Sequence, residues 1–290
     1  MNRGDEALPN GTEGANRWLG SKRFRARTVQ YLAAAFVVFC ASLSVARIVR
    51  SAIFGGHPWI TGDWLIRYAD GYVRRGFLGE FLTWLSDSTE VPLLVVVTAF
   101  QVGLFAIFVL FSLFLFFASA RRGAHLLLLV SPAFVAFHFW DFQGGFRKEI
   151  LALAVLSVLL WWSTRSFTFA FARAAFAICW TVAPALFALS HEALAFFAPL
   201  LLVVFGSVRS QVGLSKSSFW VVATVGSLLT ALALGAAALH SGDLSDVQSN
   251  CLSATSRGLS QEICGVAISA LGINIDSALW GVSGSATPLY

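Results

Sequence analysis

The chain has 290 residues, of which 57% are hydrophobic and 12% are charged, and its mean hydropathy is +0.75. Soluble domains carry about 25% charged residues, so this composition excludes an ordinary soluble protein. The net charge is +5, and the basic residues that produce it are suited to facing anionic lipid. It gives no reason to expect a nucleic-acid partner.

The chain divides into three segments by composition. Residues 1–27 are polar with little apolar periodicity, which predicts a disordered cytoplasmic tail. This tail is too long and polar for the start of a signal peptide, and no small-residue cleavage site follows, so the first apolar run is expected to remain as an anchor. Residues 28–240 predict a transmembrane helical domain, and residues 241–290 an extracytoplasmic C-terminal segment.

The expected fold class is all-α, a polytopic transmembrane helical bundle of about seven spans, since a span needs roughly 20 apolar residues. The apolar runs cover residues 29–46, 91–119, 123–140, 150–163, 167–189, 192–207 and 218–240. Four of them meet the required length. The runs at 123–140, 150–163 and 192–207 are short, which is typical of tilted, broken or re-entrant segments. Unbroken apolar runs exclude the alternating segments of a membrane β-barrel.

Basic residues predict the orientation, because cytoplasmic loops of membrane proteins are enriched in Lys and Arg. The arginine-rich segment before the first run places the N-terminus in the cytoplasm. Eight basic residues then fall outside and count against this orientation: Arg47, Arg50, Arg67, Arg74, Arg75, Arg147, Lys148 and Arg257. In its favour, every Asp and Glu after Glu13 lies outside or at the outer end of a span. The outer face is therefore expected to be the working face.

The first outer region, residues 47–90, concentrates charge that is scarce elsewhere. From Gly71 to Leu85 apolar residues recur at helical spacing, which predicts an amphipathic helix lying in the membrane interface. Arg74 and Arg75 at its start suit bidentate phosphate contacts, although anchoring to anionic headgroups explains them as well. Three glycines lower its helix propensity, as expected where a backbone or a lipid tail approaches closely: Gly71, Gly76 and Gly79.

A second charged cluster lies in the predicted turn before the run at 150–163. Arg147 and Lys148 open the next helix, where cations oppose the helix dipole. An anionic ligand would offset this conflict, because the helix N-terminus and the cations would then bind it together. The alternative is that Asp141 and Glu149 simply pair with these cations.

The third cluster is the pair His191 and Glu192, at another predicted outer helix junction. His191 could carry a proton or donate a hydrogen bond to a sugar or phosphate, although such a pair is often structural. The histidines are scattered without metal-ligand spacing, so neither a metal site nor a cofactor is expected.

Two of the four cysteines flank a polar segment of the C-terminal region. Cys251 and Cys264 are predicted to form a disulfide in an oxidising compartment, closing a loop of about 14 residues that is worth roughly 3 kcal/mol. Two free thiols are the alternative. Cys40 and Cys179 lie inside apolar runs, where a small thiol is ordinary.

An outer loop with an early Asp and an interfacial helix, followed by charged outer turns, resembles the layout of the polytopic GT-C glycosyltransferases. The likeness covers roughly residues 29–240. The segment Asp-Gly-Tyr-Val-Arg-Arg-Gly, residues 70–76, also looks like one in uncharacterised bacterial membrane proteins of the surface-polysaccharide kind. The resemblance implies transfer of a sugar from a polyprenyl-phosphate carrier to a glycan or lipid acceptor at the extracytoplasmic face, in cell-envelope assembly.

The resemblance also implies roles for particular residues. Asp63 is the first choice for the general base that deprotonates the acceptor hydroxyl, and Asp70 is the second. His191 and Glu192 would orient sugar or acceptor hydroxyls. The remaining substrate-binding residues would hold the carrier phosphate or line its turn: Arg74, Arg75, Asp141, Arg147 and Lys148.

Two other classes of function stay open. One is a transporter or flippase for a lipid-linked or anionic substrate, for which Pro132, Pro184 and Pro199 could break helices. The scarcity of ionisable groups within the apolar runs counts against it. The other is a non-catalytic subunit of an envelope complex. Charged outer turns that converge favour the enzyme, and turns that scatter favour a docking surface.

Overall fold

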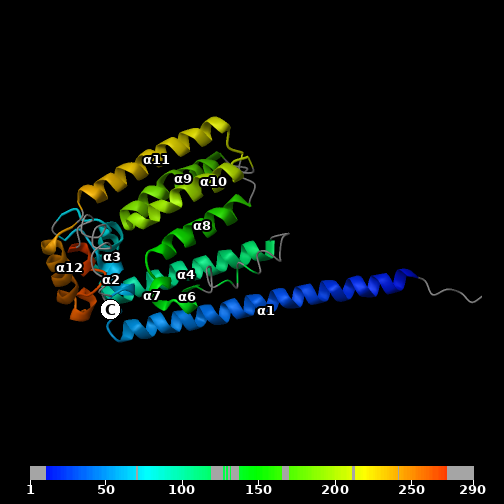
Figure 1. Cartoon of the computed structure of the whole chain (residues 1–290), viewed down its shortest axis with the longest axis horizontal. Coiled ribbons are helices and arrows are strands. Elements are labelled where there is room, and N and C mark those ends of the chain that lie inside the picture. Colours follow the sequence, from blue (N-terminus) through cyan, green and yellow to red (C-terminus); the bar gives the residue numbers. More distant parts are fainter. Residues whose placement is uncertain are drawn as a thin grey trace, which may run out of the picture.

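The computed structural model describes residues 11–69, 71–118, 127, 129, 131, 137–164, 170–210, 213–240 and 242–272. All regular elements in these ranges are helices, which confirms the all-α class. Figure 1 shows long helices lying side by side, with short helices gathered at one end of them.

Four helices in the described ranges are long and apolar enough to cross a membrane. They are α1 (Gly11–Ile53, apolar from Thr28), α4 (Leu93–Ala118), α9 (Ala170–Ser190, apolar from Arg173) and α11 (Lys216–Leu239). These four correspond to the runs that meet the length of a span in the sequence.

The other predicted spans have no full-length helix in the described ranges. The run at 150–163 forms α8 (Glu149–Ser163), which has 15 residues. The run at 192–207 forms the 3₁₀ helix η1 (Glu192–Phe196) followed by α10 (Phe197–Val208). Most of the run at 123–140 lies outside the described residues, and its end forms α6 (Phe137–Trp140). Hydropathy and helix length therefore support four spans.

The first helix also extends beyond the apolar run. It begins at Gly11, so it includes residues 11–27 of the segment predicted as a polar tail, whereas residues 1–10 lie outside the described part. The portion suited to the membrane begins at Thr28, where the apolar run begins in the sequence.

One end of the bundle collects the connecting segments. At this end α1, α9 and α11 finish and α4, α8 and α10 begin (Figure 1). We call it the loop end. It contains α2 (Ile60–Leu65), α3 (Gly76–Thr89), α7 (Phe142–Gly145), α12 (Leu244–Ser256), η2 (Gln261–Cys264) and η3 (Ser269–Gly272). All three charged clusters predicted from the sequence belong to segments of this end.

The amphipathic helix predicted from Gly71 forms, but it begins at Gly76. Arg75, immediately before it, has φ of 68°, a left-handed conformation that is uncommon for a residue with a side chain. The helix buries Leu78 and Leu82 against the protein and exposes Trp84 on its other face. The start differs from the prediction because Arg74 and Arg75 form a turn, after which α3 packs on α2.

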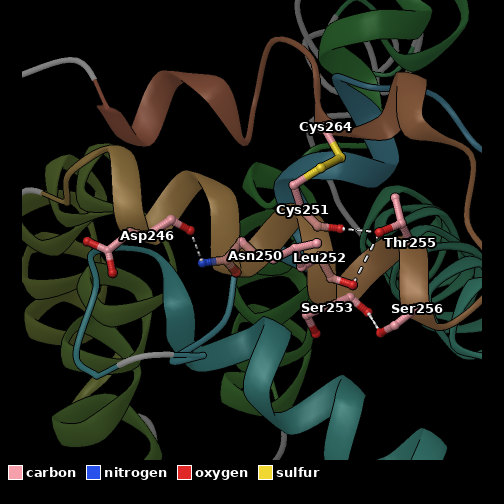
Figure 2. Close-up of a disulfide and its surroundings, with 8 residues drawn as sticks. All are labelled: Asp246, Asn250, Cys251, Leu252, Ser253, Thr255, Ser256 and Cys264. Atoms are coloured by element: carbon pink, nitrogen blue, oxygen red, sulfur yellow. Dashed lines mark hydrogen bonds between the residues drawn. A yellow bond between two sulfur atoms is a disulfide. The ribbon is translucent and has the colours of Figure 1, made fainter.

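The C-terminal segment folds against the first outer region. Cys251 and Cys264 form the predicted disulfide, which joins α12 to η2 (Figure 2). The side chain of Asn250 accepts a hydrogen bond from the backbone N–H of Arg67 at 2.8 Å, and Arg257, the residue after α12, pairs with Asp87 of α3. The C-terminal segment therefore holds the loop that carries Asp63 from one side.

Removing the disulfide is expected to lower the free energy of unfolding by about 3 kcal/mol, because the bridge restricts the unfolded chain. The double variant Cys251→Ser, Cys264→Ser should therefore melt earlier in a thermal scan of intrinsic tryptophan fluorescence. Cys179→Ser is the control, since this exposed cysteine is free. Alkylation of Cys251 and Cys264 in the non-reduced, denatured protein would contradict the pairing.

Candidate functional site

The centre of the site is Asp63, in the short helix α2. Its side chain is 1% exposed, and neither carboxylate oxygen has a hydrogen-bond partner in the described part of the chain. Buried carboxylates are ordinarily paired or hydrogen-bonded, because leaving water costs several kcal/mol. His57 holds the start of α2, since its Nδ1 accepts the N–H of Trp59 at 3.2 Å. Asp63 thus presents two unbonded acceptors from a fixed helix.

Cations from two other segments surround this carboxylate. Lys148, just before α8, is fully buried, and its Nζ donates to the carbonyl oxygen of Arg75 at 2.7 Å. Lys148, Arg75 and Arg147 all act electrostatically on Asp63. The first outer region and the turn before α8 therefore meet at one point, although 85 residues separate Asp63 from Lys148.

The third segment joins them through an ion pair. The guanidinium of Arg75 forms an ion pair with the carboxylate of Glu192, and its Nε donates to the two carboxylate oxygens at 2.8 and 3.0 Å. His191, the residue before it, is 4% exposed and lies beside Arg147. All three predicted clusters thus contribute to one site at the loop end, and they do not scatter over the surface.

The environment sets the charges of the site. Burial alone would raise the pKa of Asp63, but Lys148 and the nearby arginines outweigh it and bring that pKa below its ordinary value. Burial lowers the pKa of Lys148 to about 8 and that of His191 to about 4. At neutral pH Asp63 is therefore ionised, Lys148 is mostly protonated, and His191 is neutral.

The ion pair between Arg75 and Glu192 should make stability depend on pH. Burial would raise the pKa of Glu192, but the hydrogen bonds from Arg75 lower it to about 2, below the ordinary value of 4.5 for a glutamate. A depressed carboxyl pKa stabilises the folded state above the unfolded-state value, and this stabilisation is lost as pH falls through the folded-state value. We expect the melting temperature to fall between pH 4.5 and 2, and to fall less in Glu192→Gln. Equal pH profiles for the two proteins would contradict this.

A residue that the sequence analysis missed ties two of the segments together. Gln101 of α4 is fully buried, and its Nε2 donates to the carbonyl oxygens of Ile60 at 3.1 Å and Phe146 at 3.0 Å. The indole of Trp64 donates to the same Phe146 oxygen at 2.9 Å. Ile60 opens the helix of Asp63, and Phe146 precedes Arg147. A lone amide in the apolar run at 91–119 is the signal that could have found it.

Replacing Gln101 with methionine should loosen this link, because methionine has a similar length and no hydrogen-bond donor. Acetylation of Lys148 by acetic anhydride is then expected to rise about tenfold, since a 1–1.5 kcal/mol loss of protection corresponds to that factor. The exposed Lys216 is the internal reference, and mass spectrometry reads both. Thr98→Val is the matched control, because in the described part of the chain the hydroxyl of Thr98 bonds within α4, to the carbonyl oxygen of Leu94. Unchanged protection of Lys148 in Gln101→Met would contradict the link.

Three residues of the predicted site lie apart from this cluster or outside the description. Arg74 turns toward the C-terminal segment, and its Nη2 donates to the carbonyl oxygen of Ala270 at 3.0 Å. Asp141 is exposed and caps α7 by accepting the N–H of Gly144 at 2.9 Å. Asp70 lies outside the described residues. The structure therefore gives Arg74 and Asp141 structural contacts, and their roles in substrate binding stay predictions.

No family model, curated protein or solved structure matches the chain.

Proposed function

We propose that this chain is a membrane glycosyltransferase that takes a sugar from a polyprenyl-phosphate carrier and adds it to a glycan or lipid acceptor. The observation that carries the proposal is the buried, ionised Asp63 with two unbonded oxygens at the loop end of apolar helices. A carboxylate that lacks donors is matched to a substrate that brings them, such as an acceptor hydroxyl. Asp63 is then the general base.

Polar chemistry at the end of membrane helices suits a substrate with an apolar tail and a polar head. A polyprenyl chain would lie along the apolar helices while its phosphate and sugar reach the loop end. The cations around Asp63 would stabilise the negative charge that develops on the departing phosphate. Glu192 is held by Arg75, so it orients this arginine as well as any hydroxyl that it contacts.

The proposal includes a topology. The N-terminus is cytoplasmic, the loop end faces outward in a bacterial inner membrane, and α8 and α10 cross or enter the membrane beside the four longer helices. Arg173 and Lys216 begin apolar stretches at the end opposite the loop end in Figure 1. This distribution of cations supports a cytoplasmic opposite end.

The test is a transfer assay with purified protein in lipid nanodiscs. Radiolabelled polyprenyl-phosphate sugars serve as donors, and lipid and glycan fractions serve as acceptors. The expected result is label transfer that requires Asp63 and disappears in Asp63→Asn. Absence of transfer from every donor, with a folded protein, would reject the enzyme and favour a transporter or a non-catalytic subunit. Movement of a labelled lipid-linked substrate across proteoliposomes would then identify the transporter.

A further inference from the structure

His191 makes two contacts that no single protonation state satisfies. Its Nδ1 accepts the backbone N–H of Ala193 at 3.2 Å, so in the neutral imidazole the proton lies on Nε2. That Nε2 lies 3.2 Å from Nη2 of Arg147, and a guanidinium has only donors. Two N–H groups therefore face each other. In the opposite tautomer the proton on Nδ1 faces the backbone N–H of Ala193 instead. In the doubly protonated ring both nitrogens carry protons, so N–H groups face each other at Arg147 and at Ala193.

Arg147 has further unused hydrogen-bonding capacity. Its Nε is buried and has no hydrogen-bond partner in the described part of the chain, and its nearest carboxylate, Glu149, lies 3.7 Å away. The guanidinium lies over the ring of Trp59, 5.0 Å from the centroid. This stacking fixes the plane of the guanidinium, and its Nη2 lies on the His191 side.

The other cations of the site are already engaged. Arg75 binds Glu192 through Nε and Nη2, and Lys148 donates to a carbonyl oxygen with none of its surface exposed. Of these three cations, Arg147 has a buried guanidinium nitrogen, Nε, that makes no hydrogen bond within the described part of the chain, and its neighbour His191 adds one more donor.

We propose that Arg147 and His191 form an anion site for a phosphate group, with Trp59 as its wall, and that a phosphate oxygen accepts from both donors. An oxygen between the two N–H groups resolves their conflict and keeps the Ala193 hydrogen bond. The inference deepens the proposed function, since it assigns the carrier phosphate to this pair.

The experiment is ligand-dependent thermal stabilisation of the full chain in a neutral detergent, read by tryptophan fluorescence. The probes are farnesyl phosphate, lysophosphatidylglycerol and inorganic phosphate, with farnesol as the uncharged counterpart of the first. A bound ligand at 100 times its Kd should raise the melting temperature by about 5 °C. Farnesyl phosphate is expected to do so and farnesol is not. A shift with lysophosphatidylglycerol alone would assign the site to a membrane headgroup, and a shift with inorganic phosphate alone to free phosphate.

Variants locate the binding. Arg147→Met and His191→Leu should each abolish the shift, whereas Arg50→Met should keep it. Arg50 is a matched control because its guanidinium also lies over an aromatic ring, that of Phe54, in the last turn of α1. Unlike Arg147, it is exposed. A shift that survives in both Arg147→Met and His191→Leu, or no shift with any phosphate probe, would overturn the anion site.

The two proposals fail in different ways. If phosphate binds only when Arg147 and His191 are present but the protein transfers no sugar, the anion site is supported and the glycosyltransferase proposal is rejected. Transfer that continues while neither variant changes phosphate binding keeps the enzyme and rejects the anion site.

Discussion

Replacing Asp63 with asparagine is expected to lower the rate of sugar transfer by about 10³-fold, because a positioned general base contributes roughly 10²–10⁴-fold. Asparagine keeps the size of the side chain and removes its basicity. The buried carboxylate of Asp63 also stabilises protonated Lys148, so this lysine should lose its proton more readily in the variant. The measurement is label transfer in nanodiscs at saturating donor, with the melting temperature recorded for each protein.

The controls separate the base from a general effect of charge. Glu262→Gln removes an exposed carboxylate of the C-terminal segment and should leave transfer unchanged. Asp70→Asn tests the second choice for the base. If Asp63→Asn retains activity within about threefold while Asp70→Asn loses it, then Asp63 is not the base and Asp70 takes that role. Full activity in the double variant would reject a catalytic carboxylate in this loop.

Replacing Gly79 with alanine is expected to produce a large loss of stability. A Cβ at this position would lie 1.9 Å from the carbonyl oxygen of Ile66 and 3.0 Å from that of Trp64. Both atoms belong to the backbone, so α3 must move away from the segment that follows α2. Overpacking of this kind costs about 3 kcal/mol or more. The thermal midpoint should fall, and transfer activity should fall with it, because α2 carries Asp63 and packs against α3.

Gly103→Ala is the matched control for Gly79→Ala. Gly103 also lies within a helix, α4, and a Cβ there would meet nothing within 4 Å. Alanine raises helix propensity by about 1 kcal/mol relative to glycine, so this variant should be as stable as the native chain or slightly more stable. Equal melting temperatures for Gly79→Ala and the native protein would show that α3 does not pack on Ile66 as closely as described.

Two adjacent arginines show which contacts cannot be predicted from the sequence. Arg74 and Arg75 are chemically alike and adjacent, so the sequence predicts the same phosphate-binding role for both. In the structure Arg74 reaches Ala270 of the C-terminal segment, while Arg75 turns back to Glu192. The left-handed backbone of Arg75 separates their directions. Lys148, which is distant in the sequence, donates to the carbonyl oxygen of Arg75, and no local sequence pattern predicts such a contact.

Gln101 gives the complementary case. Its position in an apolar run is visible in the sequence, and a polar side chain within a membrane helix ordinarily has a partner. Its two acceptors, however, are carbonyl oxygens of Ile60 and Phe146. Every residue has a carbonyl oxygen, so the sequence offers no means of choosing among them. Similarly, the sequence placed His191 near a ligand but gave no hint of its conflict with Arg147.

The sequence by itself determined the membrane class, the four long helices, the amphipathic helix of the first outer region and the pairing of Cys251 with Cys264. These follow from hydrophobic length, helical period and short spacing, which are local quantities. The tertiary structure decided which charged residues meet Asp63, which are engaged elsewhere, and which hydrogen-bonding groups have no partner. Those outcomes depend on contacts between segments far apart in the chain, where side-chain direction and burial, and not composition, set the energy.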